Sequence, residues 1–144
     1  MKIKILSVGR KNADPLNQLV NDYINRIKKF LPVEDIVLKP SSDDKLKERL
    51  QKENKPCIVA LDEKGHQFTS IEFSKELEGF MNSGKQNIIF VIGQAEGLSK
   101  EIISSAYSVI SLSKMTLPHR FARLLLTEQI YRGLCIIKNI PYHK

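Results

Sequence analysis

The fold is decided by the stretch Ile88-Ile89-Phe90-Val91-Ile92, which opens directly into Gly93-Gln94-Ala95-Glu96-Gly97. Five consecutive apolar residues predict a strand buried on both faces, as is typical of a parallel sheet covered by helices. A glycine-containing turn after such a strand presents backbone N–H and C=O groups at the edge where open α/β sheets bind ligands. The stretch therefore predicts an α/β fold with a polar ligand site at this edge.

Working outward, strand and helix patterns alternate five times along the 144 residues. The periodicity predicts a single domain over residues 1–144, with a parallel sheet flanked by helices. We expect strands at 2–8, 33–39, 57–61, 87–92 and 107–112. A polar loop is expected at 62–68. We expect helices at 15–30, 43–53, 70–81, 99–106 and 118–138.

Helix starts carry recognisable signals. Asp14 before Pro15 and Ser42 before an acidic pair are candidate N-caps, Thr69 with Glu72 has the form of a capping box, and Ser99 is a further cap. Pro118 suits the first turn of the last helix.

The last helix has no wide polar face, because its apolar residues fall on three sides of a helical wheel. We expect it to pack on its own sheet and also on a partner subunit, the alternative being a central helix of a monomer. Gly133 in its interior costs about 1 kcal/mol relative to alanine, which suits a position where another backbone comes close.

The net charge of +7 is uneven: residues 1–40 carry +4, residues 41–110 carry −2 and residues 111–144 carry +5, with Glu128 the sole acidic residue after position 110. A basic end favours a polyanionic partner such as RNA, and a solvated basic surface explains the charge equally well. Without a long apolar run or a leader pattern, we expect a cytoplasmic protein with no membrane span. Cys57 and Cys135 have no paired spacing and are expected to be buried thiols.

One motif is misleading. Residues 79–86 match the spacing of a phosphate-binding loop, but the pattern places a helix before them and a strand after them, the reverse of the required order. The scattered histidines His66, His119 and His143 lack the spacing of metal ligands, so no metal site is expected.

The chain resembles the RlmH family of small SPOUT-superfamily methyltransferases over most of its length. The most specific matches are the run from Ser111 to His119 and the ending Pro141-Tyr142-His143-Lys144. Further matching segments are Phe90-Val91-Ile92-Gly93, Glu96-Gly97-Leu98, Arg123 and Glu128-Gln129-Ile130-Tyr131-Arg132. The chain departs from the family at Gln94, where a second glycine is usual. A glutamine there would be strained if the position required a positive φ.

The resemblance implies a SPOUT-type α/β fold with a C-terminal trefoil knot, a homodimer, and S-adenosylmethionine as cofactor. It implies methylation of N3 of a pseudouridine in large-subunit (23S) rRNA on the ribosome. Carried over by position, the cofactor-binding residues are Leu61, Gly93, Leu112, Ser113, Lys114, Met115, Thr116 and Leu117. The alternative is that these residues form ordinary strand-to-helix turns and bind no cofactor.

Three residues near the end are the candidate catalytic groups. We expect His143 to take the N3 proton, Arg132 to stabilise the developing oxyanion, and Tyr142 to stack on the flipped base. The alternatives are a solvated terminal histidine, an ion pair from Arg132 to Glu128, and simple packing of Tyr142. The tail is expected to lie at the pocket mouth and to complete the other subunit's site.

For RNA contact the basic candidates on the last helix are Arg120, Arg123 and Lys138, with Lys2, Lys4, Arg10 and Lys11 adding charge near the amino end. Two other functions stay open. One is a SPOUT relative that methylates a tRNA ribose 2′-hydroxyl, and the other is a knotted RNA-binding protein without catalysis.

Overall fold

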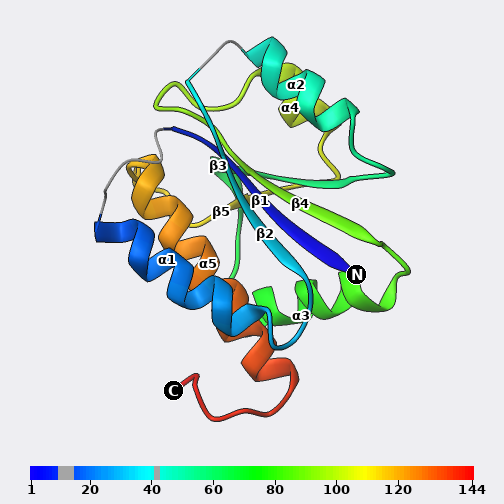
Figure 1. The fold of residues 1–144 in the computed structure, drawn as a ribbon, viewed down its shortest axis with the longest axis vertical. Coiled ribbons are helices and arrows are strands. Elements are labelled where there is room, and N and C mark those ends of the chain that lie inside the picture. The colour runs from blue at the N-terminus through cyan, green and yellow to red at the C-terminus, as the bar shows by residue number, and fades with distance from the viewer. Residues whose placement is uncertain (10–14, 41–42) are drawn as a thin grey trace.

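The computed structural model describes residues 1–9, 15–40 and 43–144, and shows one parallel sheet between two layers of helices (Figure 1). The strand order is β2-β1-β4-β3-β5. The strands are β1 (Lys2–Val8), β2 (Val33–Leu38), β3 (Cys57–Gln67), β4 (Asn87–Ile92) and β5 (Ser108–Ser111). The helices are α1 (Pro15–Ile27), α2 (Asp43–Gln51), α3 (Ser70–Asn82), α4 (Lys100–Ser105) and α5 (His119–Ile137). The predicted single-domain α/β class is confirmed.

Strand β4 occupies the centre of the sheet, between β1 and β3. All five of its apolar residues, Ile88 to Ile92, are buried. This is the burial that an unbroken apolar run predicts.

The two faces of the sheet carry separate hydrophobic clusters. One cluster joins Ile3 and Ile5 of β1 to apolar residues of α1, α3 and α5. The other joins Leu6 and Val8 of the same strand to α2 and α4. Successive side chains of a strand point to opposite faces, so one strand supplies both layers.

Helix α5 packs between α1 and α3, and Gly133 lies where α3 comes close to it. A Cβ at Gly133 would lie 2.7 Å from the Cδ1 atom of Leu77 and 3.5 Å from the Cα atom of Ser74. The close approach expected at this glycine is confirmed.

The predicted caps hold wherever the structure describes them. Thr69 and Glu72 form both hydrogen bonds of the capping box, and Ser99 accepts a hydrogen bond from the backbone of Ile102. Pro118 is the N-cap of α5 rather than part of its first turn. Asp14 and Ser42 lie outside the described residues. The helix-then-strand order around residues 79–86 is confirmed, since α3 ends at Asn82 and β4 begins at Asn87.

The loop predicted at 62–68 is wrong in part, because β3 continues to Gln67. Leu61 and His66 both pair with Ile110, so the four residues between them bulge out of the ladder before pairing resumes. Cys57 and Cys135 are buried free thiols, as expected. Within the described ranges, no helix is long and apolar enough to cross a membrane. The trefoil knot stays a prediction.

The prediction that Arg123 contacts RNA phosphates is wrong, because the side chain is buried. Only 8% of the Arg123 side chain and 6% of the Asp35 side chain are exposed. Arg123 Nε donates to Asp35 at 3.0 Å, a second Arg123 nitrogen pairs with the other carboxylate oxygen, and Nη1 donates to Asn17 at 2.7 Å. Arg123 therefore ties α5 to β2 and α1.

Replacing Arg123 with alanine leaves Asp35 as an unpaired buried charge. We expect Arg123→Ala to lower the free energy of unfolding by about 3–5 kcal/mol, measured by urea denaturation followed by circular dichroism. Lys75→Ala, at an exposed site on α3, is the control and should change it by less than about 0.5 kcal/mol. Equal effects of the two substitutions would show that the Arg123 ion pair does not hold the helices together.

Candidate functional site

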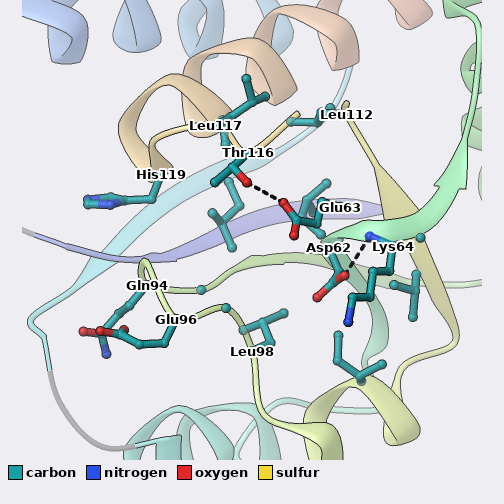
Figure 2. Close-up of a pocket in the computed structure, with 18 of the residues that line it drawn as sticks. Asp62, Glu63, Lys64, Gln94, Glu96, Leu98, Leu112, Thr116, Leu117 and His119 are labelled. Atoms are coloured by element: carbon teal, nitrogen blue, oxygen red, sulfur yellow. Dashed lines mark hydrogen bonds between the residues drawn. The ribbon is translucent and has the colours of Figure 1, made fainter. Parts of the chain in front are cut away.

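A cavity of about 820 Å³ lies beside the bulge of β3 and the carboxyl ends of β4 and β5 (Figure 2). Its walls are the bulge of β3, the turn after β4, helix α4, the loop after β5 and the first residues of α5. Of the residues predicted to bind a cofactor, those that line it are Leu61, Gly93, Leu112, Ser113, Met115, Thr116 and Leu117. Lys114 is not among the lining residues.

The turn after β4 depends on the absence of a side chain at Gly93. A Cβ there would lie 2.8 Å from the backbone carbonyl carbon of Gly97. The turn is closed by the Gly97 N–H, which donates to the Gln94 carbonyl at 2.8 Å, and Gly97 itself has a φ of +82°. Gln94 is not among the described residues with positive φ. The backbone strain that a positive φ would impose on a glutamine therefore does not arise.

The β3 bulge forms the opposite wall. Asp62 accepts a hydrogen bond from the Lys64 N–H at 2.8 Å, which orders the bulge from within. The bulge comes close to β5 at Gly65. A Cβ at Gly65 would lie 2.8 Å from the backbone of Val109 and Ile110, so only glycine allows this approach. Glu63 accepts a hydrogen bond from the Thr116 hydroxyl at 2.8 Å and so joins the bulge to the loop after β5 (Figure 2).

The loop after β5 is ordered by its own serines. Ser111 Oγ donates to the Ser113 carbonyl at 2.9 Å, and Ser113 Oγ accepts from the Met115 N–H at 3.0 Å. Met115 is left 77% exposed. A large exposed apolar side chain at the rim of a cavity suits contact with a ligand or another subunit.

His119 lines the cavity although it carried no role in the sequence-based prediction. It lies toward one end of the cavity with Gln94 and Glu96, whereas Asp62 and Lys64 lie toward the other (Figure 2). A Cβ on Gly9 would lie 3.0 Å from His119 Nε2. Glu63 was also missed, because nothing in the sequence signals a bulge that turns it toward Thr116.

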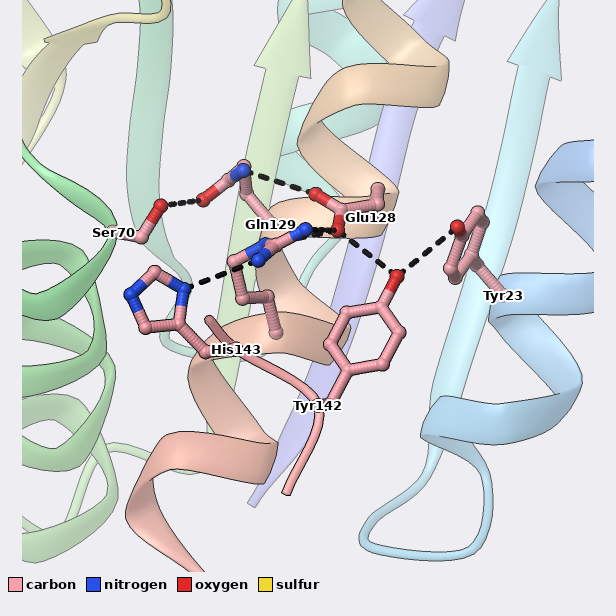
Figure 3. A network of polar contacts seen from close by, with 7 residues as sticks. Tyr23, Ser70, Glu128, Gln129, Tyr142 and His143 are labelled. Atoms are coloured by element: carbon pink, nitrogen blue, oxygen red, sulfur yellow. Dashed lines mark hydrogen bonds and ion pairs between the residues drawn. The ribbon is translucent and has the colours of Figure 1, made fainter. Parts of the chain in front are cut away.

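A second polar cluster lies at the far end of α5, where the tail folds back on the helix (Figure 3). Glu128 is its centre. One carboxylate oxygen, Oε1, accepts from Arg132 Nε at 2.9 Å, from Arg132 Nη2 at 2.7 Å and from the Tyr142 hydroxyl at 3.1 Å. The other, Oε2, accepts from Gln129 at 2.9 Å. Glu128 had entered the prediction only as a possible partner of Arg132, through their i, i+4 spacing.

The tail residues Tyr142 and His143 contact side chains of helix α5, and Tyr142 also contacts helix α1. The Tyr142 ring packs edge-on against Tyr131 at 4.8 Å between centroids, and its hydroxyl lies 3.1 Å from that of Tyr23. Arg132 lies over the Tyr142 ring at 5.0 Å, and its Nη1 lies 3.1 Å from His143 Nδ1. Burial, followed by the hydrogen bonds to Tyr23 and Glu128, raises the pKa of Tyr142. The hydrogen bond to Glu128 is the main cause that raises the pKa of Arg132.

Within one chain, the tail does not reach the cavity. His119 lines the cavity and Arg132 lies 13 residues further along α5, which is about 20 Å along a helix. Figure 1 shows α5 running from the strand-end side to the opposite side of the molecule, where the chain ends. Arg132, Tyr142 and His143 are thus brought together with one another, but not with the cofactor-binding candidates of the same chain.

The remaining basic candidates are dispersed. Arg120 and Lys138 are exposed at opposite ends of α5. Lys2 pairs with Glu34, and Lys4 donates to Glu53 at 2.7 Å. Burial would raise the pKa of Glu53, but hydrogen bonds from Lys4, Asn87 and Arg49 outweigh it and lower that pKa to about 2. Arg10 and Lys11 lie outside the described residues. No group of metal-ligating side chains occurs in the described part of the chain.

Comparison with known proteins gives a consistent result along the whole chain. A family model described as a predicted SPOUT methyltransferase matches residues 1–143. Relatives named ribosomal RNA large subunit methyltransferase H include a protein of Christiangramia forsetii, 38% identical, with 99% of each chain covered. Another, from Clostridium perfringens strain 13, is 39% identical, with 100% of each chain covered.

Solved structures share the fold at low sequence identity. A probable methylase family protein from Haemophilus influenzae Rd KW20 superposes with a TM-score of 0.58 at 11% identity, over 99% of this chain and 70% of the other. The SpoU methyltransferase AviRb from Streptomyces viridochromogenes, in complex with AdoMet, gives a TM-score of 0.50 at 13% identity, over 97% and 58%.

Tyr142 makes the stability of the tail cluster sensitive to alkaline pH. Because its folded-state pKa is raised above the ordinary value of 10.0, the stabilisation is complete below about pH 10 and is lost as the pH rises further. We expect Tyr142→Phe to lower the free energy of unfolding by about 1 kcal/mol at pH 8. The deficit should shrink above pH 10 in urea titrations. A constant deficit up to pH 11 would contradict the assignment.

Proposed function

The chain belongs to the SPOUT methyltransferase family, and from this we propose that it uses S-adenosylmethionine to methylate N3 of a pseudouridine in large-subunit rRNA. The observation that carries the proposal is the cavity at the bulge of β3 and the ends of β4 and β5, which is lined by segments that the family resemblance assigns to the cofactor. The full-length similarity to relatives named as rRNA large subunit methyltransferases supports the substrate.

The cavity fits the cofactor in size and in chemistry. Ligand cavities in proteins measure roughly 300–1,000 Å³ and combine apolar walls with a few polar groups. Leu61, Leu112 and Leu117 supply apolar wall, and the turn at Gly93 brings backbone groups close to a ligand because no side chain intervenes. When bound there, the cofactor supplies an electrophilic methyl group on a sulfonium.

We assign the acceptor side of the reaction to Arg132, Tyr142 and His143. Methyl transfer is a displacement in which alignment of donor and acceptor supplies up to ~7–11 kcal/mol of the acceleration. The protein must also deal with the N3 proton and with the negative charge that spreads onto the carbonyl oxygens of the base. Tyr142 offers an aromatic face for a flipped base, and Arg132 and His143 offer polar groups beside it.

These two halves belong to one active site only in a homodimer, in which the tail of one subunit lies at the cavity of the other. Apolar side chains exposed along α5 and beside it support such an interface. Phe121 is 46% exposed, Leu125 43% and Leu19, on the neighbouring helix α1, 46%. A twofold interface in which the two copies of α5 run antiparallel brings the end of one helix to the start of the other.

The RNA surface we propose uses Arg120 and Lys138, now without Arg123. In an antiparallel dimer these exposed residues from opposite ends of α5 come from different subunits and flank the same site. Recognition by shape on the assembled ribosome suits this surface. Such a substrate places the enzyme in the cytoplasm.

Methyl transfer from radiolabelled S-adenosylmethionine to ribosomes that lack the modification tests the function. Label on N3 of a pseudouridine in large-subunit rRNA is the expected result. Label on a ribose 2′-hydroxyl of tRNA would replace the proposal with that of a SPOUT ribose methyltransferase. Binding to ribosomes without label would leave a non-catalytic RNA-binding protein.

Adding one methyl group at Gly93 should weaken cofactor binding, because the new Cβ must displace the backbone of Gly97. For Gly93→Ala we expect the dissociation constant for S-adenosylmethionine, measured by isothermal titration calorimetry, to rise by about 10-fold or more. Gly79→Ala on α3 is the matched control, since a Cβ there meets nothing within 4 Å. Equal affinity in the two variants would place the cofactor elsewhere.

Mixed dimers test the shared site. A variant that lacks residues 139–144 and a Gly93→Val variant are each expected to be inactive, because each damages both sites of its own homodimer. Random mixing should restore about a quarter of wild-type activity, since half of the dimers then hold one intact site. Mixed dimers that form but stay inactive would show that each chain uses its own tail.

A further inference from the structure

We propose that His143 acts as a hydrogen-bond donor through Nε2–H, held in this tautomer by Arg132, and does not act as the base that removes the N3 proton. This inference rests on the proposed function and assigns a role to one group of that site. It replaces the expectation, drawn from the sequence, that a terminal histidine accepts the proton.

The contact between Arg132 and His143 defines the tautomer. Arg132 Nη1 lies 3.1 Å from His143 Nδ1. A guanidinium carries only donors and stays protonated, so the imidazole Nδ1 must be the acceptor. A neutral imidazole has one proton, and with Nδ1 accepting that proton is on Nε2. The free edge of His143 therefore presents an N–H and no lone pair.

Arg132 is not free to turn away and release Nδ1. Its Nε and Nη2 both donate to Glu128, at 2.9 and 2.7 Å, while its plane lies over the Tyr142 ring. Both donors converge on the same oxygen, Glu128 Oε1, and these two charge-assisted hydrogen bonds restrict the orientation of the guanidinium as well as its position. Nη1 is thereby aimed at the tail.

Glu128 is in turn fixed from the other side. Gln129 donates to Glu128 Oε2 at 2.9 Å, and the amide of Gln129 is oriented by the Ser70 hydroxyl, which donates to its oxygen at 2.8 Å (Figure 3). Only 15% of the Glu128 side chain is exposed. A chain of contacts from α3 through α5 to the tail thus orients one imidazole, which makes Glu128 and Arg132 positioning residues.

The chemistry of methyl transfer to N3 is consistent with a hydrogen-bond donor at His143 Nε2. The N3 lone pair forms the new N–C bond, the C–S bond breaks with its electrons passing to sulfur, and the N3 proton passes to water. Negative charge develops on a carbonyl oxygen beside N3 as the proton leaves. An N–H aimed at that oxygen stabilises the charge where it forms, and loss of one such donor typically costs about 10²–10³ in rate.

Substitution of His143 by glutamine distinguishes a hydrogen-bond donor from a general base. A glutamine side chain can place an N–H near the position of Nε2 but has no basic nitrogen. We expect His143→Ala to lower kcat for ribosome methylation by about 10²-fold or more, and His143→Gln to stay within about 10-fold of wild type, with cofactor affinity unchanged in both. Equally low kcat values for the two variants would overturn the proposal.

Nuclear magnetic resonance reports the tautomer of His143 in a measurement that does not depend on catalytic turnover. Long-range ¹H–¹⁵N correlations of the wild-type protein should show the Nε2–H form for the signal that disappears in His143→Gln, with His66 as an internal reference. In Arg132→Leu the Nδ1–H form should become measurably populated, because a free imidazole favours Nε2–H only modestly. An Nδ1–H form in the wild type would refute the inference, whereas absence of methyl transfer by the wild type would instead refute the proposed function.

Discussion

Helix α5 is the constraint on which the remaining structure depends. It spans His119–Ile137 and is buried between α1, α3 and the sheet, so it is a rigid spacer of roughly 28 Å. The cavity lies at its start and the tail cluster at its end. No rearrangement of a six-residue tail that leaves α5 intact and Tyr142 on Glu128 brings these two groups together in one chain. The dimer that we propose would bring the two groups together, with the apolar residues exposed along α5 at its interface.

Two glycines allow backbone segments around the cavity to approach one another. Gly93 and Gly65 each stand where a Cβ would collide with neighbouring backbone, so the turn after β4 and the bulge of β3 can close around a small ligand. The positive φ of this turn is at Gly97 and not at Gln94, so a glutamine is accommodated there without strain. The polar link from Glu63 to Thr116 then joins the two walls.

The sequence was sufficient to predict the layers of the fold and the two loops, after β4 and after β5, that line the cavity. It was not sufficient to predict contacts between side chains that lie far apart along the chain. The run Ile88 to Ile92 predicted the central strand because burial on both faces leaves a local pattern. Arg123 was misread because its partner Asp35 is 88 residues away along the chain, and a buried ion pair looks like any surface arginine in a helix. The β3 bulge was missed for the same reason, whereas the pair of Glu128 with Arg132 is local, at i, i+4, and was foreseen as an alternative.

A crystal structure with S-adenosylmethionine, or with its demethylated product, tests the central claim most directly, because it shows both halves of the site together. The account predicts the ligand against Gly93 and the 112–117 loop, with the tail of the neighbouring subunit at the cavity mouth and its imidazole Nε2 facing the space for the acceptor base. An empty cavity, or a ligand bound there with the neighbouring tail remote from it, would contradict the account.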